Sequence, residues 1–229
     1  MRWSAADEGR HRPGGGRWWQ EAWEFDAWWD GGRAGVCVHV SLLPDQRRAW
    51  YWAALVRPAV PVVVVHDLDV ALPRQALELR AAGLWADHVC ETPFDHWTVA
   101  NEAHGVALDD PEEGARRGYG DVVAMAFDLE WEQAGEAQPA LAGEGLDGYV
   151  LACEVHGEIH LADGALTVAG QGARRHWWGE RGWFDRPWGD AEADAGAQLV
   201  LSLQGDGRRS RFTRRLARSG WTERNQPVG

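Results

Sequence analysis

The stretch Leu84–Thr92 combines two acids and a histidine at a spacing that could support proton transfer. If this stretch is extended, Asp87 and Glu91 share one face with Trp85, and His88 lies on the opposite face. Apolar walls disfavour the charged form of a carboxylic acid and so keep a proton available for donation near neutral pH. The pattern predicts Asp87 or Glu91 as a general acid, unless this face is exposed and both carboxylates only make it soluble.

The stretch ARRHWWGERGWFDRPW, residues 173–188, holds four Trp and four Arg. A Trp face attracts a cation by about 0.5–1 kcal/mol when exposed and by about 2 kcal/mol or more when desolvated. Several Trp around one pocket could therefore stabilise a carbocation and bury an apolar substrate, or they could stack on Arg as structural contacts. We predict His88 or His176 as a proton relay and Arg174 as an orienting or anion-stabilising group. The predicted substrate-binding residues are Trp52, Trp85, Trp97, Trp177 and Trp178.

A second polar stripe, formed by His156, Glu158 and His160, follows one face of a predicted strand. Side chains two residues apart on a strand can share a metal, and His with Glu suits zinc or iron. The same alternation is typical of any half-buried strand, so we predict no metal here. A metal-dependent oxygenase remains a weaker alternative, and no organic cofactor is predicted.

The elements that must position these residues are strands, because the dominant hydrophobic period is two and turn signals separate short segments. About twelve strands with little helix predict an all-β fold of one large barrel or two packed half-barrels. The predicted strands are Gln20–Trp29, Ala34–Leu43, Arg47–Arg57, Val62–Val65, Ala76–Ala82, Leu84–Thr92, His96–Leu108, Asp121–Trp131, Gly148–Leu161, Ala165–Ala173, Gln198–Gln204 and Arg209–Gly220.

The segment Glu132–Asp147, rich in Gly, Ala, Glu and Pro, is the best candidate for a linker. It predicts an N-terminal β domain over residues 18–134 and a C-terminal β domain over residues 146–224. Residues 1–17 are rich in Gly and are expected to be a flexible lead-in. The Arg-rich run that begins at Arg208 is expected to be the solvated face of an edge strand.

Composition excludes several classes of function. The net charge of −12 disfavours a nucleic-acid partner. All 23 basic residues are Arg, so Schiff-base and P-loop lysine chemistry are both excluded. Ser is scarce and no GxSxG motif is present, which argues against a serine hydrolase, and no dinucleotide-binding fingerprint is found. No apolar run suits a bilayer or a secretory signal, so we expect a cytoplasmic protein that does not insert into membranes.

Segments such as WEFDAWWDGGRAGVCVHVSLLP, VHGEIHL and GQGARRHWWGERGW resemble an actinobacterial group of proteins. That group is similar to the carotenoid hydratase (hydroxyneurosporene synthase) superfamily of tandem lipocalin-like proteins. The resemblance runs from about Trp18 to Trp183 and implies two lipocalin-like β-barrels with a pocket for polyenes, terpenoids or polyketide-derived chains. Members of that superfamily hydrate, cyclise or rearrange such molecules without an organic cofactor.

This chain departs from the superfamily pattern in two respects. Arg175 stands where relatives usually carry Asp, so a proton donated by that Asp in relatives must come from another group here. The chain also ends soon after the matching region, which implies a shortened second barrel.

We therefore predict an enzyme of specialised metabolism that cyclises, hydrates or isomerises an unsaturated hydrophobic substrate by acid catalysis in a Trp-lined pocket. The alternative is a non-catalytic lipocalin-like protein that binds a hydrophobic metabolite. Both hypotheses expect a hydrophobic small molecule as the partner and leave the oligomeric state open.

Overall fold

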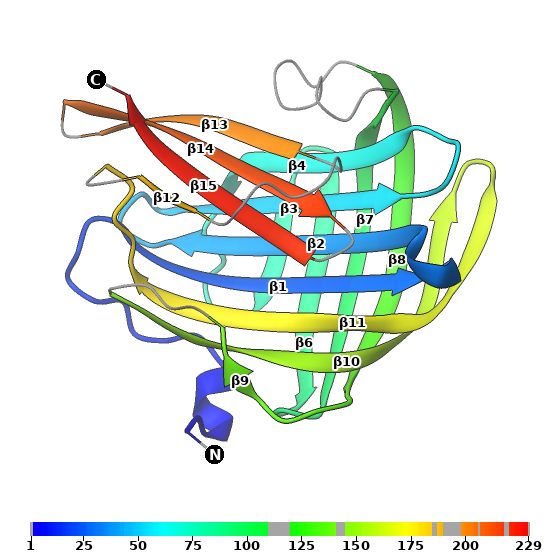
Figure 1. The fold of residues 1–229 in the computed structure, drawn as a ribbon, viewed down its shortest axis with the longest axis horizontal. Helices are drawn as coiled ribbons and strands as arrows, with labels where there is room; N and C mark the ends of the chain where they lie inside the picture. Colours follow the sequence, from blue (N-terminus) through cyan, green and yellow to red (C-terminus); the bar gives the residue numbers. More distant parts are fainter. Residues whose placement is uncertain are drawn as a thin grey trace.

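The computed structural model describes residues 2–109, 120–140, 145–184, 187–189, 198–205, 207–217 and 220–228. These residues form antiparallel strands with two short 3-10 helices, which confirms the predicted all-β class. An 11-stranded sheet curls into a partial barrel, and a 4-stranded sheet lies against its outside (Figure 1). The chain thus forms one large half-barrel and a smaller second sheet.

The large sheet has the order β4-β3-β2-β1-β11-β10-β8-β7-β6-β5, and β9 pairs with β10. An additional pairing of β4 with β7 joins the two sides of the curled sheet. Its strands are β1 (Trp19–Trp29), β2 (Ala34–Leu43), β3 (Arg48–Val56), β4 (Val62–Ala71), β5 (Leu77–Ala81), β6 (Leu84–Thr92), β7 (His96–Leu108), β8 (Asp121–Gln133), β9 (Gln138–Pro139), β10 (Leu146–Leu161) and β11 (Gly164–Glu180).

The predicted strands match these elements closely, and β2, β6 and β7 have the predicted bounds. The largest difference is β11, which continues past Ala173 to Glu180. Residues 174–178 include consecutive buried side chains, because this part of the strand is covered on both sides, and the period-two signal is therefore lost.

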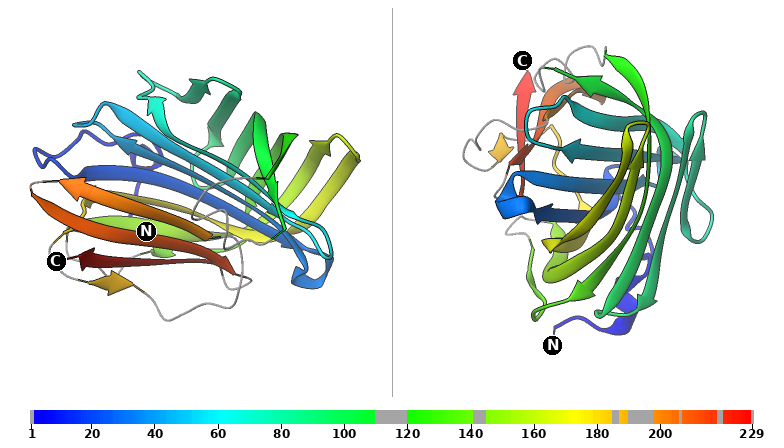
Figure 2. Two further views of the ribbon diagram at one scale, coloured as in Figure 1. Left: turned by 90° about the horizontal axis from the view of Figure 1, so that it is seen from above. Right: turned by 90° about the vertical axis from the view of Figure 1, so that its right-hand side faces the viewer.

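Strand β1 is the clearest case of a strand buried on both faces. Trp23 and Phe25 belong to the apolar core inside the curled sheet. Glu24 and Asp26, which alternate with them, are each 4% exposed on the outer face. Figure 2 shows the small sheet standing on that outer side of β1–β3. The fold consequently buries two separate sets of side chains along one strand.

The small sheet has the order β12-β15-β14-β13. Its amide side chain Asn225 donates to the carbonyl of Trp183 at 2.7 Å, and the guanidinium of Arg208 lies 5.5 Å from the ring centre of Phe184. The strands are β12 (Trp188–Gly189), β13 (Gln198–Gly205), β14 (Arg208–Ala217) and β15 (Gly220–Val228).

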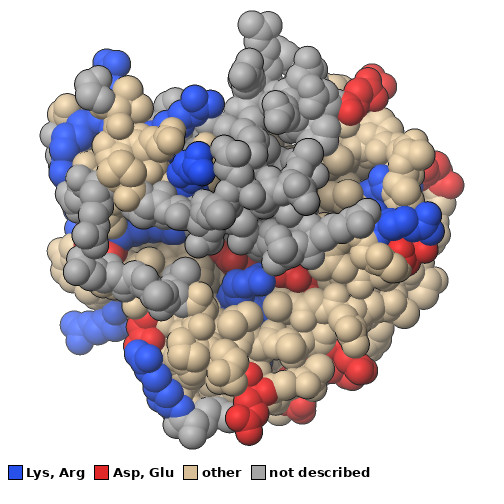
Figure 3. Space-filling view, in the orientation of Figure 1, with Lys and Arg blue, Asp and Glu red and all other residues tan. Residues whose placement is uncertain are grey.

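The expectation that the Arg-rich run forms an edge strand is wrong, because β14 pairs with β13 on one side and β15 on the other. The run was also expected to be solvated, and its described side chains Arg208, Arg209 and Arg211 are exposed. Figure 3 shows Arg side chains gathered at this end of the molecule. Arg218 lies outside the described residues.

The N-terminal segment, expected to be a flexible lead-in, makes buried contacts with the end of the barrel. It forms the 3-10 helix η1 (Ala5–Glu8). Trp3 is 7% exposed and packs on Tyr149 with a ring-centre distance of 5.5 Å, and Glu8 is 2% exposed. The second 3-10 helix, η2 (Asp30–Gly32), makes the turn between β1 and β2.

The predicted division into residues 18–134 and 146–224 stays a prediction. In the sheet, β10 pairs with β8, and β11 pairs with β1, so residues 146–180 belong to the large sheet. Within β10, Gly157 has a φ of 137°, a conformation that other residues rarely adopt, and a Cβ there would collide with the carbonyl oxygen of Asp128. In the part of the chain that the structure describes, no helix has the length and hydropathy needed to cross a membrane.

We expect Trp131→Ala to lower the free energy of unfolding by about 3–5 kcal/mol. Trp131 is fully buried, and its indole N–H donates to the carbonyl of Asp26 at 3.0 Å. Trp131→Phe keeps the ring contact with Phe25 and should cost less. Val122→Ala is the matched control, because Val122 lies on the same strand and is 72% exposed. Urea unfolding measures all three variants, and a wild-type midpoint for Trp131→Ala would contradict this packing.

Candidate functional site

Buried polar side chains gather on both faces of β1 and its neighbours. On the inner face, β1 and β11 pair so that Trp23 lies opposite His176 and Phe25 lies opposite Arg174. The N-terminal segment closes this end of the barrel. We call the group on this face the inner cluster: Glu8, His11, Glu21, Arg174 and His176.

The first half of the inner cluster is a buried ion pair between Glu8 and Arg174. Nη1 of Arg174 donates to both carboxylate oxygens of Glu8, at 2.8 and 2.9 Å, and both side chains are at most 3% exposed. The indole N–H of Trp97 donates to Glu8 at 2.5 Å, and the backbone N–H of Phe94 donates to it at 3.2 Å. Nε and Nη2 of Arg174 have no hydrogen-bond partner among the described residues. The guanidinium thus keeps donors available inside the barrel.

The second half is a carboxylate shared by two imidazoles. Oε1 of Glu21 lies 2.8 Å from Nδ1 of His11 and 2.9 Å from Nε2 of His176. Nε2 of His11 lies 3.2 Å from a carboxylate oxygen of Asp7. These contacts join the N-terminal segment to β1 and β11.

Burial and hydrogen bonding act in opposite directions on these groups. Burial alone would lower the pKa of His11, but hydrogen bonds to Glu21 and Asp7 outweigh it, so the pKa of His11 is raised. Burial alone would raise the pKa of Glu21, but hydrogen bonds from His11 and His176 outweigh it, so that pKa is lowered. Around neutral pH, His11 therefore favours the cation and Glu21 the anion.

His176 is buried between two hydrogen-bond acceptors. Burial lowers the pKa of His176, and the Glu21 carboxylate opposes that shift. Nδ1 of His176 lies 2.8 Å from the carbonyl oxygen of Asp7, and Nε2 faces Glu21. Both neighbours are acceptors, so a neutral ring always leaves one nitrogen lone pair facing an oxygen. The lowered pKa favours the neutral ring around neutral pH, with one of its nitrogens facing an acceptor oxygen.

Aromatic faces line the same cluster. Trp23 stacks on His176 with ring centres 4.2 Å apart, and Trp178 stacks on His11 at 3.7 Å. The guanidinium of Arg174 lies 5.9 Å from the ring centre of Trp97. Each of these faces can stabilise a neighbouring cation.

The structure brings four of the predicted site residues together, namely Arg174, His176, Trp97 and Trp178. Sequence reasoning missed Glu8, His11 and Glu21. Glu8 and His11 lie in a Gly- and Arg-rich segment with no hydrophobic period, so no pattern could assign them to a buried site. Glu21 had a weak signal, because it shares a face with Trp23 on a predicted strand.

The other predicted catalytic residues lie away from the inner cluster. Asp87 and Glu91 share the outer face of β6, where Glu91 is exposed and Asp87 is half-buried. Burial raises the pKa of Asp87, and the negative charge of the nearby Glu78 raises it further. His88 points to the interior, where burial lowers its pKa to about 3, and neither ring nitrogen has a partner among the described residues.

The remaining predicted binding residues lie outside the barrel. Trp52 packs in a small outer core with Cys37 and Val64. Trp177 is buried on the outer face of β11, and the guanidinium of Arg181 lies 4.6 Å from its ring centre. Arg175 is also on this face and donates to Asp26 at 2.5 Å. Arg175 is therefore paired with a neighbouring acid on the outer face.

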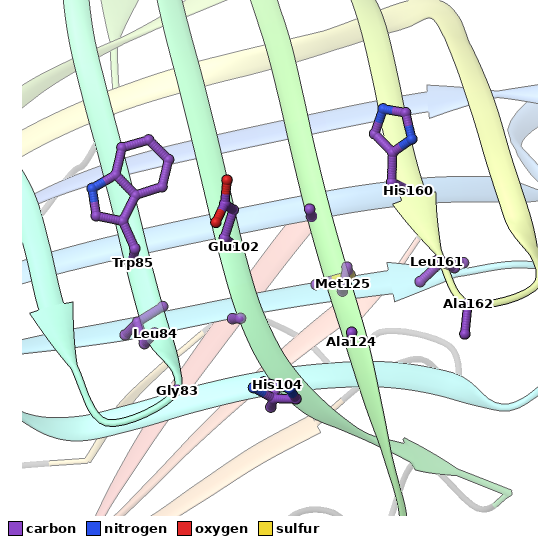
Figure 4. Close-up of a pocket in the computed structure, with 12 residues that line it drawn as sticks. Gly83, Leu84, Trp85, Glu102, His104, Ala124, Met125, His160, Leu161 and Ala162 are labelled. Atoms are coloured by element: carbon purple, nitrogen blue, oxygen red, sulfur yellow. The ribbon is translucent and has the colours of Figure 1, made fainter.

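Trp85 borders an open groove of about 630 Å³ on β6, β7, β8 and β10. Figure 4 shows Trp85 on one side of the groove, His160 on the other and Glu102 between them. Trp85 is the one Trp that lines this groove, which differs from the Trp-lined pocket expected from the sequence.

In the described part of the chain, potential metal ligands form two groups of three. One group is His11, Glu21 and His176, and the other is Glu130, Glu132 and His156. In each group the ligand atoms lie within 4.8 Å of one another. The predicted stripe of His156, Glu158 and His160 is exposed on β10. Absence of a metal stays a prediction.

The fold and the inner cluster define an all-β, partly closed barrel with acid and base groups inside one end. The chain matches a protein family described as a domain of unknown function (DUF7064) over residues 4–225. Because the match covers nearly the whole chain, the protein belongs to this family. No curated protein matches the chain.

Two solved structures are similar at low identity. The crystal structure of CghA with Sch210972 is 13% identical, with a TM-score of 0.43 over 91% of this chain and 59% of that chain. The crystal structure of CghA is 12% identical, with a TM-score of 0.42 over 86% of this chain and 53% of that chain. The chain thus spans less than two thirds of the length of CghA, and so remote a likeness assigns no activity.

Removing the carboxylate of Glu8 should be strongly destabilising. Glu8→Leu leaves the Arg174 charge buried without its partner, which costs about 3–5 kcal/mol of unfolding free energy. The double variant Glu8→Leu with Arg174→Met should recover much of that loss, because both charges are replaced by apolar groups. Glu154→Gln, on an exposed Glu of β10, is the control. Chemical denaturation measures the cycle, and a wild-type stability for Glu8→Leu would refute the buried pair.

The stabilisation by His11 should depend on pH. Folding raises the pKa of His11 above its ordinary 6.5, so its stabilisation is complete below pH 6.5 and is lost as pH rises through the folded value. Folding lowers the pKa of Glu21 from 4.5, so its contribution is complete above pH 4.5 and is lost as pH falls through its folded value. His11→Phe should thus lose more stability at about pH 5.5 than at about pH 9. Thermal unfolding at the two pH values checks this, and an equal loss at both would contradict it.

Proposed function

We propose that the protein is a cofactor-independent enzyme of specialised metabolism. It cyclises, hydrates or isomerises an unsaturated hydrophobic small molecule, of terpenoid or polyketide origin, by proton transfer at the inner cluster. The observation that carries this proposal is the Glu21 carboxylate shared by His11 and His176 beneath stacked Trp rings. The resemblance to the carotenoid hydratase superfamily supports the same class of reaction.

The proton donor is the His11–Glu21–His176 set. A cationic imidazole in this set transfers a proton to an alkene carbon, and the electron pair of the double bond forms the new C–H bond. The resulting carbocation then either loses a proton to the neutral imidazole or bonds to water, and the added water gives its extra proton to that imidazole. His11, whose pKa is raised, supplies the proton in the first step, and His176, whose pKa is lowered, accepts the proton in the second.

The walls of the cluster suit the charge that develops during this reaction. The faces of Trp23, Trp97 and Trp178 attract a carbocation without reacting with it. The guanidinium of Arg174 can hold an oxygen substituent of the substrate, because two of its nitrogens lack partners among the described residues. Substrate enters at the end that the N-terminal segment covers, where His11 and Trp178 are half-buried.

The reaction can be tested with deuterium. In D₂O, the protein should convert at least one of geraniol, farnesol, geranylgeraniol or a linear polyene ester to an isomer or hydrate with deuterium bound to carbon. His176→Gln should lower this conversion by about a hundredfold, the contribution of a general acid or base. Liquid chromatography with mass spectrometry detects the product, and Glu154→Gln is the control.

Separate variants test the acids predicted from the sequence. If Asp87→Asn or Glu91→Gln abolishes conversion and His176→Gln does not, the proton comes from the outer face of β6 and the inner cluster is not the donor. Conversion by none of the probes, with no quenching of Trp fluorescence, contradicts the proposed function.

The alternative function is a lipocalin-like carrier of a hydrophobic metabolite. The open groove of about 630 Å³ beside Trp85 is the place where such a ligand could lie. Stoichiometric quenching of Trp fluorescence by a probe that is recovered unchanged would favour the carrier over the enzyme.

A further inference from the structure

The outer face of β1 and β2 carries a second chemical arrangement, formed by Glu24, His39 and Ser41. Oγ of Ser41 lies 2.5 Å from Nε2 of His39, and Nδ1 of His39 lies 3.3 Å from Oε1 of Glu24. His39 and Ser41 share a face of β2, and Glu24 is the residue opposite His39 on β1. All three side chains are buried between the sheets.

The hydrogen bonds of this row allow Ser41 to donate to His39. Nε2 of Gln20 donates to Oγ of Ser41 at 2.7 Å, and an amide nitrogen can only donate. With one acceptor site of Oγ filled, the Ser41 hydroxyl can donate to Nε2 of His39 when the ring carries its proton on Nδ1, the nitrogen that faces Glu24. The indole N–H of Trp177 donates to the same Glu24 oxygen at 3.2 Å and holds it in place. A serine hydroxyl polarised by an oriented imidazole is the arrangement of nucleophilic catalysis.

We propose that Ser41 is a nucleophile for acyl transfer, with His39 as its general base and Glu24 as the group that orients His39. The site takes small carboxylic esters with apolar acyl groups, because the cross-strand neighbours of Ser41 are Ala22 and Trp50. This activity goes beyond the function proposed above, since the row lies on the opposite face of β1 from the inner cluster.

The chemistry balances with water as the second reactant. Oγ of Ser41 bonds to the ester carbonyl carbon while its proton passes to Nε2 of His39. The C–O bond to the alcohol then breaks, and His39 returns the proton to the leaving alkoxide. Water attacks the acyl-serine, gives a proton to His39 and releases the carboxylic acid, and the proton returns to Ser41.

Gln20 supplies an independent indication of a ligand. Its side chain is 1% exposed, and Oε1 has no hydrogen-bond partner among the described residues. A buried acceptor of this kind is uncommon and suits the hydroxyl of a leaving alcohol or an attacking water. Nε2 of the same amide, beside Oγ of Ser41, can donate to the oxyanion that forms on the attacked carbon.

The test is covalent labelling of the full-length protein with phenylmethylsulfonyl fluoride, followed by intact and peptide mass spectrometry. We expect one phenylmethylsulfonyl group on Ser41, with loss of fluoride, and no adduct in Ser41→Ala. His39→Ala should abolish labelling, and Glu24→Gln should slow it by about 10²- to 10⁴-fold. Ser210→Ala is the matched control, because Ser210 is equally buried but pairs with Asn225 rather than a histidine.

A second probe, p-nitrophenyl acetate, should give a burst of p-nitrophenol and an acetyl group on Ser41. An unmodified Ser41 with both probes, or equal labelling of Ser41→Ala and wild type, overturns the proposal. Labelling of Ser41 that survives in His39→Ala also overturns it. In the proposal His39 removes the proton of Ser41, so the reaction must be lost without His39. The two proposals fail separately, since labelling reports on the outer face and deuterium transfer reports on the inner cluster.

Discussion

The register of β1 between β2 and β11 is the constraint on which the rest of the structure depends. Side chains alternate along a strand, so this register sends Trp23 into the core and Glu24 to the outer face. A slip by one residue would exchange the two sets and bury charges in the apolar core. Because β1 is covered on both sides, both sets of side chains are buried. Burial and hydrogen bonding shift pKa values in the inner cluster, and they bring Ser41 and His39 into contact on the outer face. The inner cluster and the Ser41 row are therefore two results of one pairing.

The N-terminal segment completes only one of these sites. Glu8 reaches Arg174 across 166 residues of sequence, and His11 reaches Glu21 across the closed end of the barrel. Burying the Glu8 carboxylate is costly unless its charge is paired and hydrogen-bonded. Trp97, Phe94 and Arg174 all donate to this carboxylate and so offset that cost. The segment is thus both a structural cap and part of the proposed acid, whereas Glu24, His39 and Ser41 of the outer row come from the neighbouring strands β1 and β2.

The sequence predicts the strands well because hydrophobic alternation is a local signal. It also places Asp87 and Glu91 on one face and His88 on the other, as the structure does. Residue type alone suggested Arg174 and His176. Glu8 and His11 could not be found, because their partners are distant in sequence and no period marks them. The proposed role of Ser41 has no sequence signal for another reason: the motif that signals a serine nucleophile describes a strand-to-helix turn, and this serine lies within a strand, two residues from His39.

The most direct test of the account is the protonation of individual histidine rings, read from long-range ¹H–¹⁵N spectra at about pH 6. The account predicts that Glu21→Gln changes the ring signals of His11 and His176 and leaves His39 unchanged. It also predicts that Glu24→Gln changes the ring signals of His39 alone. A change of His39 in Glu21→Gln, or unchanged His11 and His176 signals in that variant, would show that the two faces of β1 are not separated as described.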